Sequence, residues 1–510
     1  MNYSMSAFQL VVQKRLFLKQ KSRNKWLNLG DNNSSYFHYL IKTRQERNAI
    51  KCLLDGDGNQ VEEVDQIKDV VVDFYQKLLG SSNDVDEAAM IQTVSSLFQD
   101  QIPEDMKSFM QREVTETEIK KKVLFSMGSE RAPRPDGFTV EFFKHAWHIV
   151  KSDFVAAIAS FFRSGKLLIE VNSTLITLVP KIPNPSTVAD FRPIACFNVV
   201  YKCITKVLAN RLQGCLNFLV NSNQAAFIKG RIISENVLLA HELVKGYHKN
   251  SGLGRCAIKA DLRKAYDSVN WNFIIMCLIA ASCPMKFVMW IRECITNPRF
   301  SISLNGSMVG YFKGGKGLRQ GDPISPYLFV IAMEAFTRIM QRKIQEPTQF
   351  KFHPYCKALK ITHLSFANDL LIFTAANLPT INLAKEGLEE FKVASNLDIN
   401  PSKSEVFFSA MPQDVKWQIL DVLQFKEGTL PVRYLGLPLI SGRLRLKNCQ
   451  PLIDKIQGRI KSWSSRKLSF AGRLQLLQFV LYTPSVPLCL SSIPFWDIPK
   501  YCPISNNKSY

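Results

Sequence analysis

The chain has 510 residues, of which 46% are apolar, so it is not a disordered tail and is long enough for several domains with a sizeable core. Lys and Arg number 65 against 43 Asp and Glu, and the net charge of +22 favours a polyanionic partner, either nucleic acid or an anionic membrane surface. No uninterrupted apolar run has the length of a membrane span, and cations from Lys14 onward interrupt any signal peptide, so we expect no membrane partner and no secretion.

Cysteine and histidine usage points to an intracellular protein without a structural metal. The twelve cysteines include no Cys-x-x-Cys pair, and the seven histidines show no ligand spacing. We therefore expect reduced core thiols and neither a zinc site nor a disulfide framework.

Helices dominate the predicted elements of the first third. Residues 7–50 predict two cation-rich helices, whose charges either form a solvated face or follow phosphates. Further helices are expected over residues 64–79, 115–127 and 142–165, the second of them opened by the capping-box pattern Thr115-Glu116-Thr117-Glu118.

Strands and helices mix in the rest of the chain. A strand is expected over residues 175–179, and two strands, 300–304 and 308–312, flank the hairpin signal Asn305-Gly306. Later helices are expected over residues 324–342, 387–396 and 452–482. Because no regular βα alternation appears, the predicted fold class is α+β.

Two acidic segments carry the candidate chemistry. Asn368-Asp369 lies between the apolar runs 363–367 and 370–373, and Asp261 ends the run 256–261. Taken alone, Asn-Asp between two strands is more often a plain hairpin turn, because both residues tolerate positive φ. Carboxylates on two β-segments could instead share the Mg²⁺ ions of a nucleotidyl-transfer centre.

Further motifs in a fixed order favour the second interpretation. From about Leu18 to Tyr482 the chain resembles reverse transcriptases of non-LTR (LINE-type) retrotransposons, of the kind common in plant genomes. The motifs that carry the resemblance are Pro133-Arg-Pro-Asp-Gly-Phe138, Leu178-Val-Pro-Lys181, Asp190-Phe-Arg-Pro-Ile194, Asn223-Gln-Ala-Ala-Phe227 with Gly230-Arg231, Asp261-Leu-Arg-Lys-Ala-Tyr-Asp267, Gly317-Leu-Arg-Gln-Gly-Asp-Pro323, Phe366-Ala-Asn-Asp369, Asn400-Pro-Ser-Lys403 and Tyr434-Leu-Gly-Leu-Pro438.

The resemblance implies a right-hand polymerase with a palm built on an antiparallel sheet. Its expected parts are a basic helical N-terminal extension over residues 1–112, fingers over 113–255, a palm over 256–440, a helical thumb over 441–483 and an irregular tail over 484–510. The reverse transcriptase domain as a whole is expected over about residues 163–440.

The resemblance also assigns roles around the palm. Asp261 and Asp369 would be the metal ligands, Asn368 stands at a catalytic position, and Lys403 would protonate the departing pyrophosphate. Tyr266 would lie under the sugar as a gate against ribonucleotides. From the residues alone, Tyr266 is equally a half-buried helix aromatic.

Four further positions are expected to bind substrate. Lys181 and Arg192 carry charges suited to a triphosphate, although each could be an ordinary surface cation. Gln320 would touch the template–nucleotide pair, and Gly321 would let the backbone approach a nucleic-acid strand. Asp267 stays open, because carboxylates at helix N-termini are commonly structural.

The implied function is RNA-directed DNA polymerisation in the nucleus. A primer 3′-hydroxyl attacks the α-phosphate of a dNTP on an RNA template, with Mg²⁺ as cofactor and Mn²⁺ as a substitute; the partners are the RNA template, the DNA primer and the RNA–DNA duplex. The alternatives are a catalytically silent nucleic-acid-binding remnant and, from a third class, a structural protein. The oligomeric state is not predicted.

One departure from the family pattern concerns activity directly. Asn368 stands where the family has the first Asp of an Asp-Asp pair, so we expect a rate lowered by roughly 10²–10⁴. Arg134 replaces a glycine, the likeness fades after Tyr482, and neither an endonuclease nor a ribonuclease H is recognised, so a truncated or degenerate copy is expected.

Overall fold

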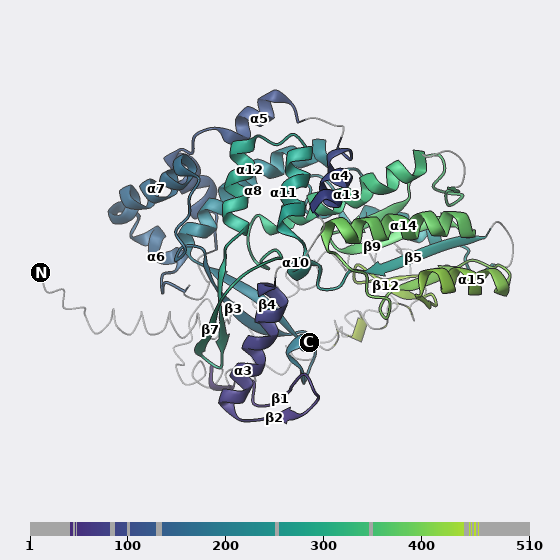
Figure 1. Ribbon diagram of the computed structural model, residues 1–510, viewed down its shortest axis with the longest axis horizontal. Helices are drawn as coiled ribbons and strands as arrows, with labels where there is room; N and C mark the ends of the chain where they lie inside the picture. The colour runs from purple at the N-terminus through teal and green to yellow at the C-terminus, as the bar shows by residue number, and fades with distance from the viewer. Residues whose placement is uncertain are drawn as a thin grey trace, which may run out of the picture. The chain divides into compact units, whose positions relative to one another are not determined.

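The computed structural model describes residues 48–81, 87–98, 102–128, 135–249, 254–345 and 350–442, with isolated positions at 41–43, 46, 448, 450, 453, 454 and 457. Contacts divide the chain into two compact units, and each is described here by itself. Unit 1 comprises Met1–Val220, Arg263–Arg338 and Glu390–Asp398, and unit 2 comprises Asn221–Leu262, Ile339–Glu389 and Ile399–Tyr510. Figure 1 shows the elements of both units.

Unit 1 contains a four-stranded sheet in the order β4-β3-β6-β7. Its strands are β3 (Ser173–Pro180), β4 (Phe191–Phe197), β6 (Arg299–Leu304) and β7 (Ser307–Lys313). β3 pairs with β4 antiparallel and with β6 parallel, and β6 and β7 form the predicted hairpin. Its loop residues Asn305 and Gly306 have φ of +50° and +92°, the left-handed geometry that makes Asn-Gly a strong hairpin signal.

One face of this sheet is packed by a helix near the start of the described chain. Helix α3 (Val64–Tyr75) continues into a π-helical turn (Gln76–Gly80) and buries one apolar side, including Ile67 and Val71, against Phe300 and Ile302. A short hairpin of β1 (Leu53–Leu54) and β2 (Gln60–Val61) adds to the same core.

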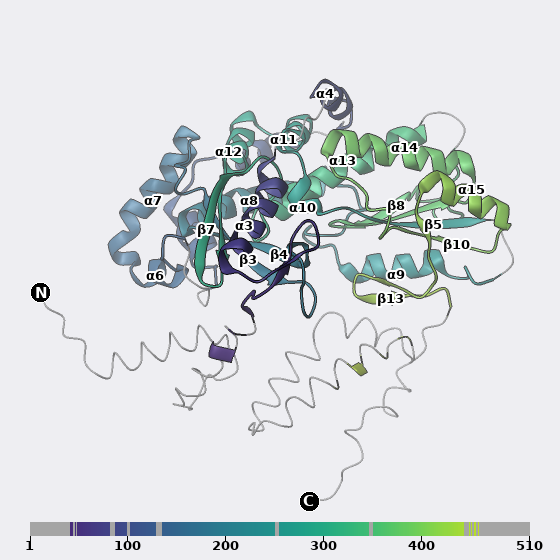
Figure 2. The same ribbon diagram turned by 60° about the horizontal axis from the view of Figure 1, so that its bottom comes forward.

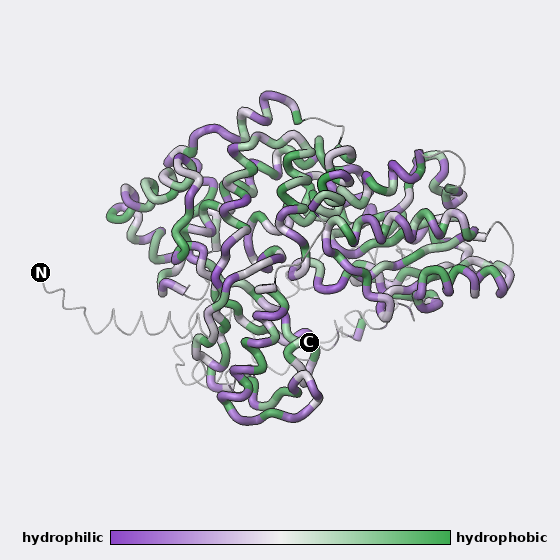
Figure 3. Tube along the Cα trace, in the orientation of Figure 1, coloured by the Kyte–Doolittle hydropathy of each residue, from purple (hydrophilic) through white to green (hydrophobic). Residues whose placement is uncertain are grey.

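The other elements of unit 1 are helical. They are α4 (Glu87–Ser95), α5 (Glu104–Gln111), a π-helix (Glu118–Leu124), α6 (Val140–His145), α7 (Trp147–Ser164), α8 (Val199–Leu219), α10 (Ala265–Ser268), α11 (Trp271–Ala280), α12 (Met285–Ile295) and the first part of α13 (Ser325–Gln345). α11 is apolar almost throughout, as Figure 3 shows, and is therefore largely buried. The guanidinium of Arg211 on α8 is fully buried and paired with Glu118 at 3.1 Å.

Unit 2 contains a five-stranded sheet in the order β11-β10-β5-β9-β8. The strands are β5 (Arg255–Asp261), β8 (His363–Phe366), β9 (Asp369–Ala375), β10 (Glu405–Phe408) and β11 (Lys426–Glu427). All neighbours pair antiparallel except β10 and β11. The fold is therefore α+β with mixed sheets, as the sequence predicted.

Helices cover both faces of this second sheet. α9 (Ile233–Val244) packs on one face with the small hairpin of β12 (Val432–Tyr434) and β13 (Leu437–Leu439), and the shared core includes Leu243, Leu371 and Phe373. The part of α14 (Leu378–Ser395) in this unit and α15 (Gln413–Leu423) lie over the opposite face, as Figure 2 shows. The sheet face that packs against α9 is therefore buried in an apolar core.

Several helix boundaries differ from prediction. The helix expected over residues 142–165 is two helices that meet at Ala146, and the one expected over 387–396 begins earlier, at Leu378. The segment 115–127 folds as a π-helix, with the predicted cap kept in part by the Glu118 N–H donating to Thr115 at 3.2 Å. Arg134, nearly all of the segment 7–50 and nearly all of the helix expected over residues 452–482 lie outside the described residues.

Candidate active site

The two predicted metal ligands face each other across a strand pair in unit 2. Asp261 ends β5, Asp369 begins β9, and the two are direct partners in the antiparallel register. Directly opposite residues of an antiparallel pair project to the same face, with Cβ atoms about 5 Å apart. Both carboxylates therefore lie on the face that carries Leu371 and Phe373, just beyond the end of the apolar core.

The loop between β8 and β9 has two residues, Ala367 and Asn368. Asp369 is not part of the loop, because it is paired with Phe366 as the first residue of β9. The residue with left-handed backbone is Ala367, at φ +55°. Asn368 is half-buried and directly precedes the second carboxylate.

The electrostatic surroundings of Asp369 match a site for cations. Partial burial of the carboxyl and the negative charge of Asp261 raise its pKa, while the nearby Lys259 ammonium acts in the opposite direction. Lys259 itself donates to the Arg433 carbonyl at 3.1 Å. Two like charges held together in this way are relieved by a bound divalent cation.

The turn over residues 400–404 is attached to the backbone of Asp261. The Asn400 N–H donates to the Asp261 carbonyl at 2.7 Å, and the Asp261 N–H donates to the Ser404 hydroxyl at 3.1 Å. Lys403 lies in this turn with an exposed side chain. The predicted lysine is thus carried by the segment that fixes the end of β5.

The carboxylate oxygens of Asp261 and Asp369 are suitable ligands for Mg²⁺, but these two residues are few anionic ligands for such a site. Carboxylate oxygens are hard ligands, and Mg²⁺ retains waters, so a pair of carboxylates can hold it together with substrate phosphates. Within the described residues, His, Cys, Asp and Glu side chains form no group of three that could hold a metal ion. Asn368 contributes a neutral amide at the position where the resemblance predicts an acid.

Unit 1 contains the predicted substrate-binding residues. Lys181 follows β3 and Arg192 lies on β4, both at the loop end of one hairpin and both exposed. The Lys181 ammonium donates to the Ala189 carbonyl at 2.6 Å. The pairing of Val179 with Arg192 brings the two cations to the same hairpin end.

Tyr266 and Gln320 come from two motifs that meet in unit 1. The Tyr266 carbonyl accepts the Leu318 N–H at 2.5 Å, and the Tyr266 ring stacks on Phe329 with centroids 4.7 Å apart. Burial raises the pKa of Tyr266 to about 12. Gln320 donates to the Asp267 carboxylate at 3.3 Å, while its carbonyl accepts the Ala195 N–H at 2.9 Å.

Gly317 and Gly321 allow this close approach. A Cβ on Gly317 would lie 2.6 Å from the Asp267 carbonyl oxygen, and Gly321 has φ +106° with the Ala195 carbonyl 3.2 Å from the position of a Cβ. The glycines are therefore required by packing between the two motifs within unit 1, and Gly321 itself remains exposed for a ligand.

Sequence reasoning left Asp267 open, and the structure gives it a defined partner. Burial raises the pKa of Asp267 to about 6, against the lowering effects of its bond to Gln320 and of the Lys264 and Lys181 charges. Its only sequence signal was its place at the end of the Asp261–Asp267 motif. Its burial depends on the Gly317 loop, fifty residues away, and no local pattern reveals that contact.

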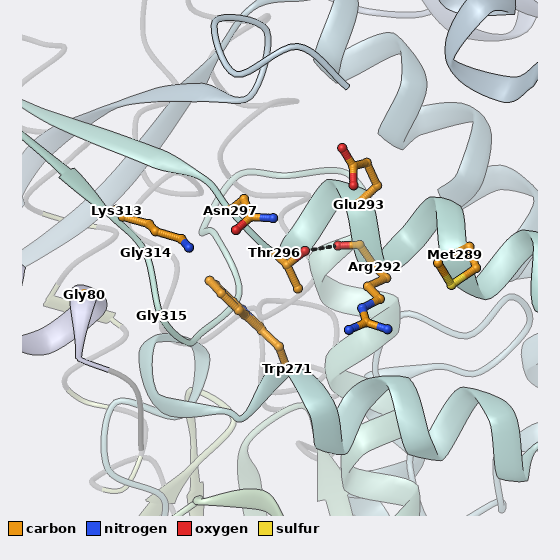
Figure 4. A pocket seen from close by; sticks show the side chains of 10 residues that line it. All are labelled: Gly80, Trp271, Met289, Arg292, Glu293, Thr296, Asn297, Lys313, Gly314 and Gly315. Atoms are coloured by element: carbon orange, nitrogen blue, oxygen red, sulfur yellow. Dashed lines mark hydrogen bonds between the residues drawn. The ribbon is translucent and has the colours of Figure 1, made fainter. Parts of the chain in front are cut away.

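Cavities in unit 1 only partly coincide with the predicted residues. Figure 4 shows a cavity of about 540 Å³ lined by Trp271, Arg292 and Lys313 among others, and none of the predicted site residues lines it. A much smaller one, about 20 Å³, is lined by Asp267 and Gln320. The smaller cavity is the one that borders the two motifs.

The predicted residues therefore form two groups. Unit 2 holds Asp261, Asn368, Asp369 and Lys403, and unit 1 holds Lys181, Arg192, Tyr266, Gln320 and Gly321. Within the described part of the chain, no helix is both long and apolar enough to cross a membrane.

Comparison with known proteins gives a consistent result. The chain is 25% identical over 470 residues to the "Transposon TX1 uncharacterized 149 kDa protein" of Xenopus laevis, which covers 89% of this chain and 34% of that protein. It is 28% identical over 270 residues (51% of this chain, 24% of the relative) to the Pol polyprotein of retrotransposable element R2 of Nasonia vitripennis. The R2DM polyprotein of Drosophila melanogaster is 24% identical over 344 residues (65% and 31%). The chain thus spans about a third or less of these relatives.

The family model described as "Reverse transcriptase (RNA-dependent DNA polymerase)" matches residues 181–439, about half of the chain, and the match includes every predicted site residue. The family implies nucleic-acid substrates and a divalent metal. This chain belongs to the reverse transcriptase family and is related to proteins of non-LTR retrotransposons.

Proposed function

We propose that this chain is an RNA-directed DNA polymerase that extends a DNA primer on an RNA template and that is slowed by Asn368. The observation that carries the proposal is the direct pairing of Asp261 with Asp369 at the end of one sheet face. When bound between these carboxylates, Mg²⁺ or Mn²⁺ would neutralise the transferring phosphate and activate the primer 3′-hydroxyl.

The protein's own groups supply the remaining roles. Lys181 and Arg192 bind the triphosphate through charge-assisted hydrogen bonds, and Lys403 protonates the departing pyrophosphate. The half-buried ring of Tyr266 supports the sugar and excludes a 2′-hydroxyl, since it is fixed by stacking on Phe329. Gln320, held by Asp267, contacts the template–nucleotide pair.

The proposal includes the arrangement of a right-hand polymerase. The fingers correspond to residues 113–255, the palm to 256–440 and the thumb to 441–483, preceded by the basic extension of residues 1–112 and followed by the tail of residues 484–510. The RNA template, the DNA primer, dNTPs and the RNA–DNA duplex are the partners, and the nucleus is the site of action.

A second candidate function is supported by the composition of the site. With Asn368 in the loop, Asp261 and Asp369 form a pair, and among the described residues no third His, Cys, Asp or Glu completes a group that could hold a metal ion. The protein would then be a nucleic-acid-binding remnant, basic and folded but catalytically silent, whose affinity falls steeply with salt.

Primer extension separates the two functions. Incorporation of dTTP on poly(rA)–oligo(dT) is measured for the unmodified chain and for Asn368→Asp, each with Mg²⁺ and with Mn²⁺. If the chain is a polymerase impaired by Asn368, the incorporation rate of Asn368→Asp should exceed that of the unmodified chain by roughly 10²–10⁴. Asp261→Asn in the repaired chain is the matched control and should abolish the gain.

The outcomes differ clearly. Salt-sensitive duplex binding without incorporation by either chain, even with Mn²⁺, supports the remnant. Equal incorporation by both chains refutes the role given to Asn368 while leaving the polymerase intact.

A further inference from the structure

The segment Asn221–Ala226 extends the sheet of unit 2 beyond β8. The Ser365 N–H donates to the Asn223 carbonyl at 2.8 Å, and the Ala225 N–H donates to the Ser365 carbonyl at 3.1 Å. Gln224 lies between these two bonds, opposite Ser365, and is only 1% exposed. A buried amide side chain needs hydrogen-bond partners, and the loop that follows β8 provides them.

The Gln224 amide bonds to both backbone groups of Ala367. Its Oε1 accepts the Ala367 N–H at 3.0 Å, and its Nε2 donates to the Ala367 carbonyl at 3.4 Å. The same Oε1 also accepts the Ala226 N–H at 3.0 Å, which fixes the rotamer. Ala367 is a loop residue without a strand partner, so the side chain replaces the missing strand neighbour.

The backbone at Gln224 is also fixed by hydrogen bonds. The Arg231 guanidinium donates to the carbonyls of Asn221 and Gln224, both at 2.5 Å. The motif Asn223–Phe227 with Gly230-Arg231, to which the catalytic proposal assigns no role, is therefore a brace from which Gln224 reaches the loop.

The loop needs such support because of its backbone. Ala367 has φ +55°, a region in which the Cβ of an L-residue crowds the backbone and which glycine adopts freely. Asp369 follows two residues later, and its side-chain direction depends on this turn. A loop free to relax would change the direction of the Asp369 carboxylate relative to Asp261.

We propose that Gln224 is a positioning residue of the polymerase site: its two-point hydrogen bond to Ala367 holds the β8–β9 loop so that Asp369 and Asp261 can share a divalent cation. This inference rests on the proposed function. Gln224 acts through the backbone of Ala367 and is not itself a ligand.

The test uses the full chain carrying Asn368→Asp, with Gln224→Met as the main variant. Methionine keeps the side-chain volume and removes both hydrogen bonds, so packing is retained. We expect the dissociation constant for Mn²⁺, measured by titration calorimetry, to rise by about 10-fold. The kcat of primer extension should fall by a similar factor while KM for primer–template changes little.

Hydrogen exchange reports on the loop independently of activity. In Gln224→Met, deuterium uptake should rise in peptides that span residues 363–370 and stay unchanged in peptides from β5. Gln224→Leu also removes both hydrogen bonds without placing a charge at this buried position, so it should give the same changes and serves if the methionine variant is poorly folded. Ser222→Ala is the matched control, because this exposed neighbour bonds only to the Asn221 side chain.

Rescue distinguishes a role in loop geometry from a general structural role. Adding Ala367→Gly to Gln224→Met lets the loop keep positive φ without the brace, so Mn²⁺ affinity and kcat should recover by about 5-fold or more. Unchanged Mn²⁺ affinity and exchange in Gln224→Met, or absence of rescue by glycine, would overturn the inference. If Asn368→Asp with intact Gln224 binds Mn²⁺ but incorporates no nucleotide, the proposed function fails while the binding and exchange results still decide the role of Gln224.

Discussion

Asp267→Asn is expected to stabilise the protein in a pH-dependent manner. Burial raises the pKa of Asp267 from 3.8 to about 6, so the folded protein disfavours the charged form. Because the pKa of Asp267 is raised on folding, its contribution to the free energy of unfolding is most favourable at low pH. That contribution falls as pH rises from about 3.8 to about 6 and stays lower above that range. Asparagine removes the charge, and its carbonyl can still accept the hydrogen bond from Gln320.

The magnitude follows from the two pKa values. A difference between 3.8 and about 6 corresponds to roughly 3 kcal/mol above pH 7, and to about half of that at pH 5. Urea unfolding of the wild-type chain and of Asp267→Asn is compared at pH 5 and pH 8. The advantage of the variant should grow with pH, and a difference that is constant or shrinks between the two values refutes the burial argument. Asp136→Asn, at an exposed acid in unit 1, is the control.

Three further predictions concern stability. Asn305→Ala should lower the free energy of unfolding by about 1–2 kcal/mol in urea titrations, because the side chain bonds to the N–H and carbonyl of Ile50 at 2.9 and 2.8 Å; no change would mean that these bonds are replaced by water. Gly317→Ala should prevent cooperative thermal unfolding of unit 1, since its Cβ would lie 2.6 Å from the Asp267 carbonyl oxygen, and a normal melt contradicts this packing. Arg211→Met should cost about 3–5 kcal/mol by leaving a buried carboxylate poorly paired, and adding Glu118→Gln should recover part of the loss.

Local signals in the sequence predicted much of the fold. The Asn305-Gly306 pair identified its hairpin because both residues accept left-handed geometry at low cost. The run that ends at Asp261 and the apolar run after Asp369 identified two strands of one sheet. Family resemblance supplied the roles, which remain predictions.

What the sequence could not predict depends on long-range contacts. Residue preference alone left Asn368-Asp369 open as a plain turn, because both residues tolerate positive φ. The structure has positive φ at Ala367 instead, whose backbone is bonded by the distant Gln224 amide. The burial of Asp267 likewise comes from a loop distant in sequence. The break at Ala146 lies between two helix-forming segments without Gly or Pro, and we have no physical account of it.

The two-residue loop before Asp369 also restricts which mutations this region can accept. Because side chains alternate along β9, an inserted or deleted residue that shifted β9 by one position against β5 would send Asp369, Leu371 and Phe373 to the opposite side of the sheet and expose the apolar core together with the acid. A substitution that keeps the loop length, such as asparagine at position 368, leaves the alternation of side chains along β9 unchanged. Related chains should therefore vary in residue type at the loop while conserving its length, which an alignment of such chains can check.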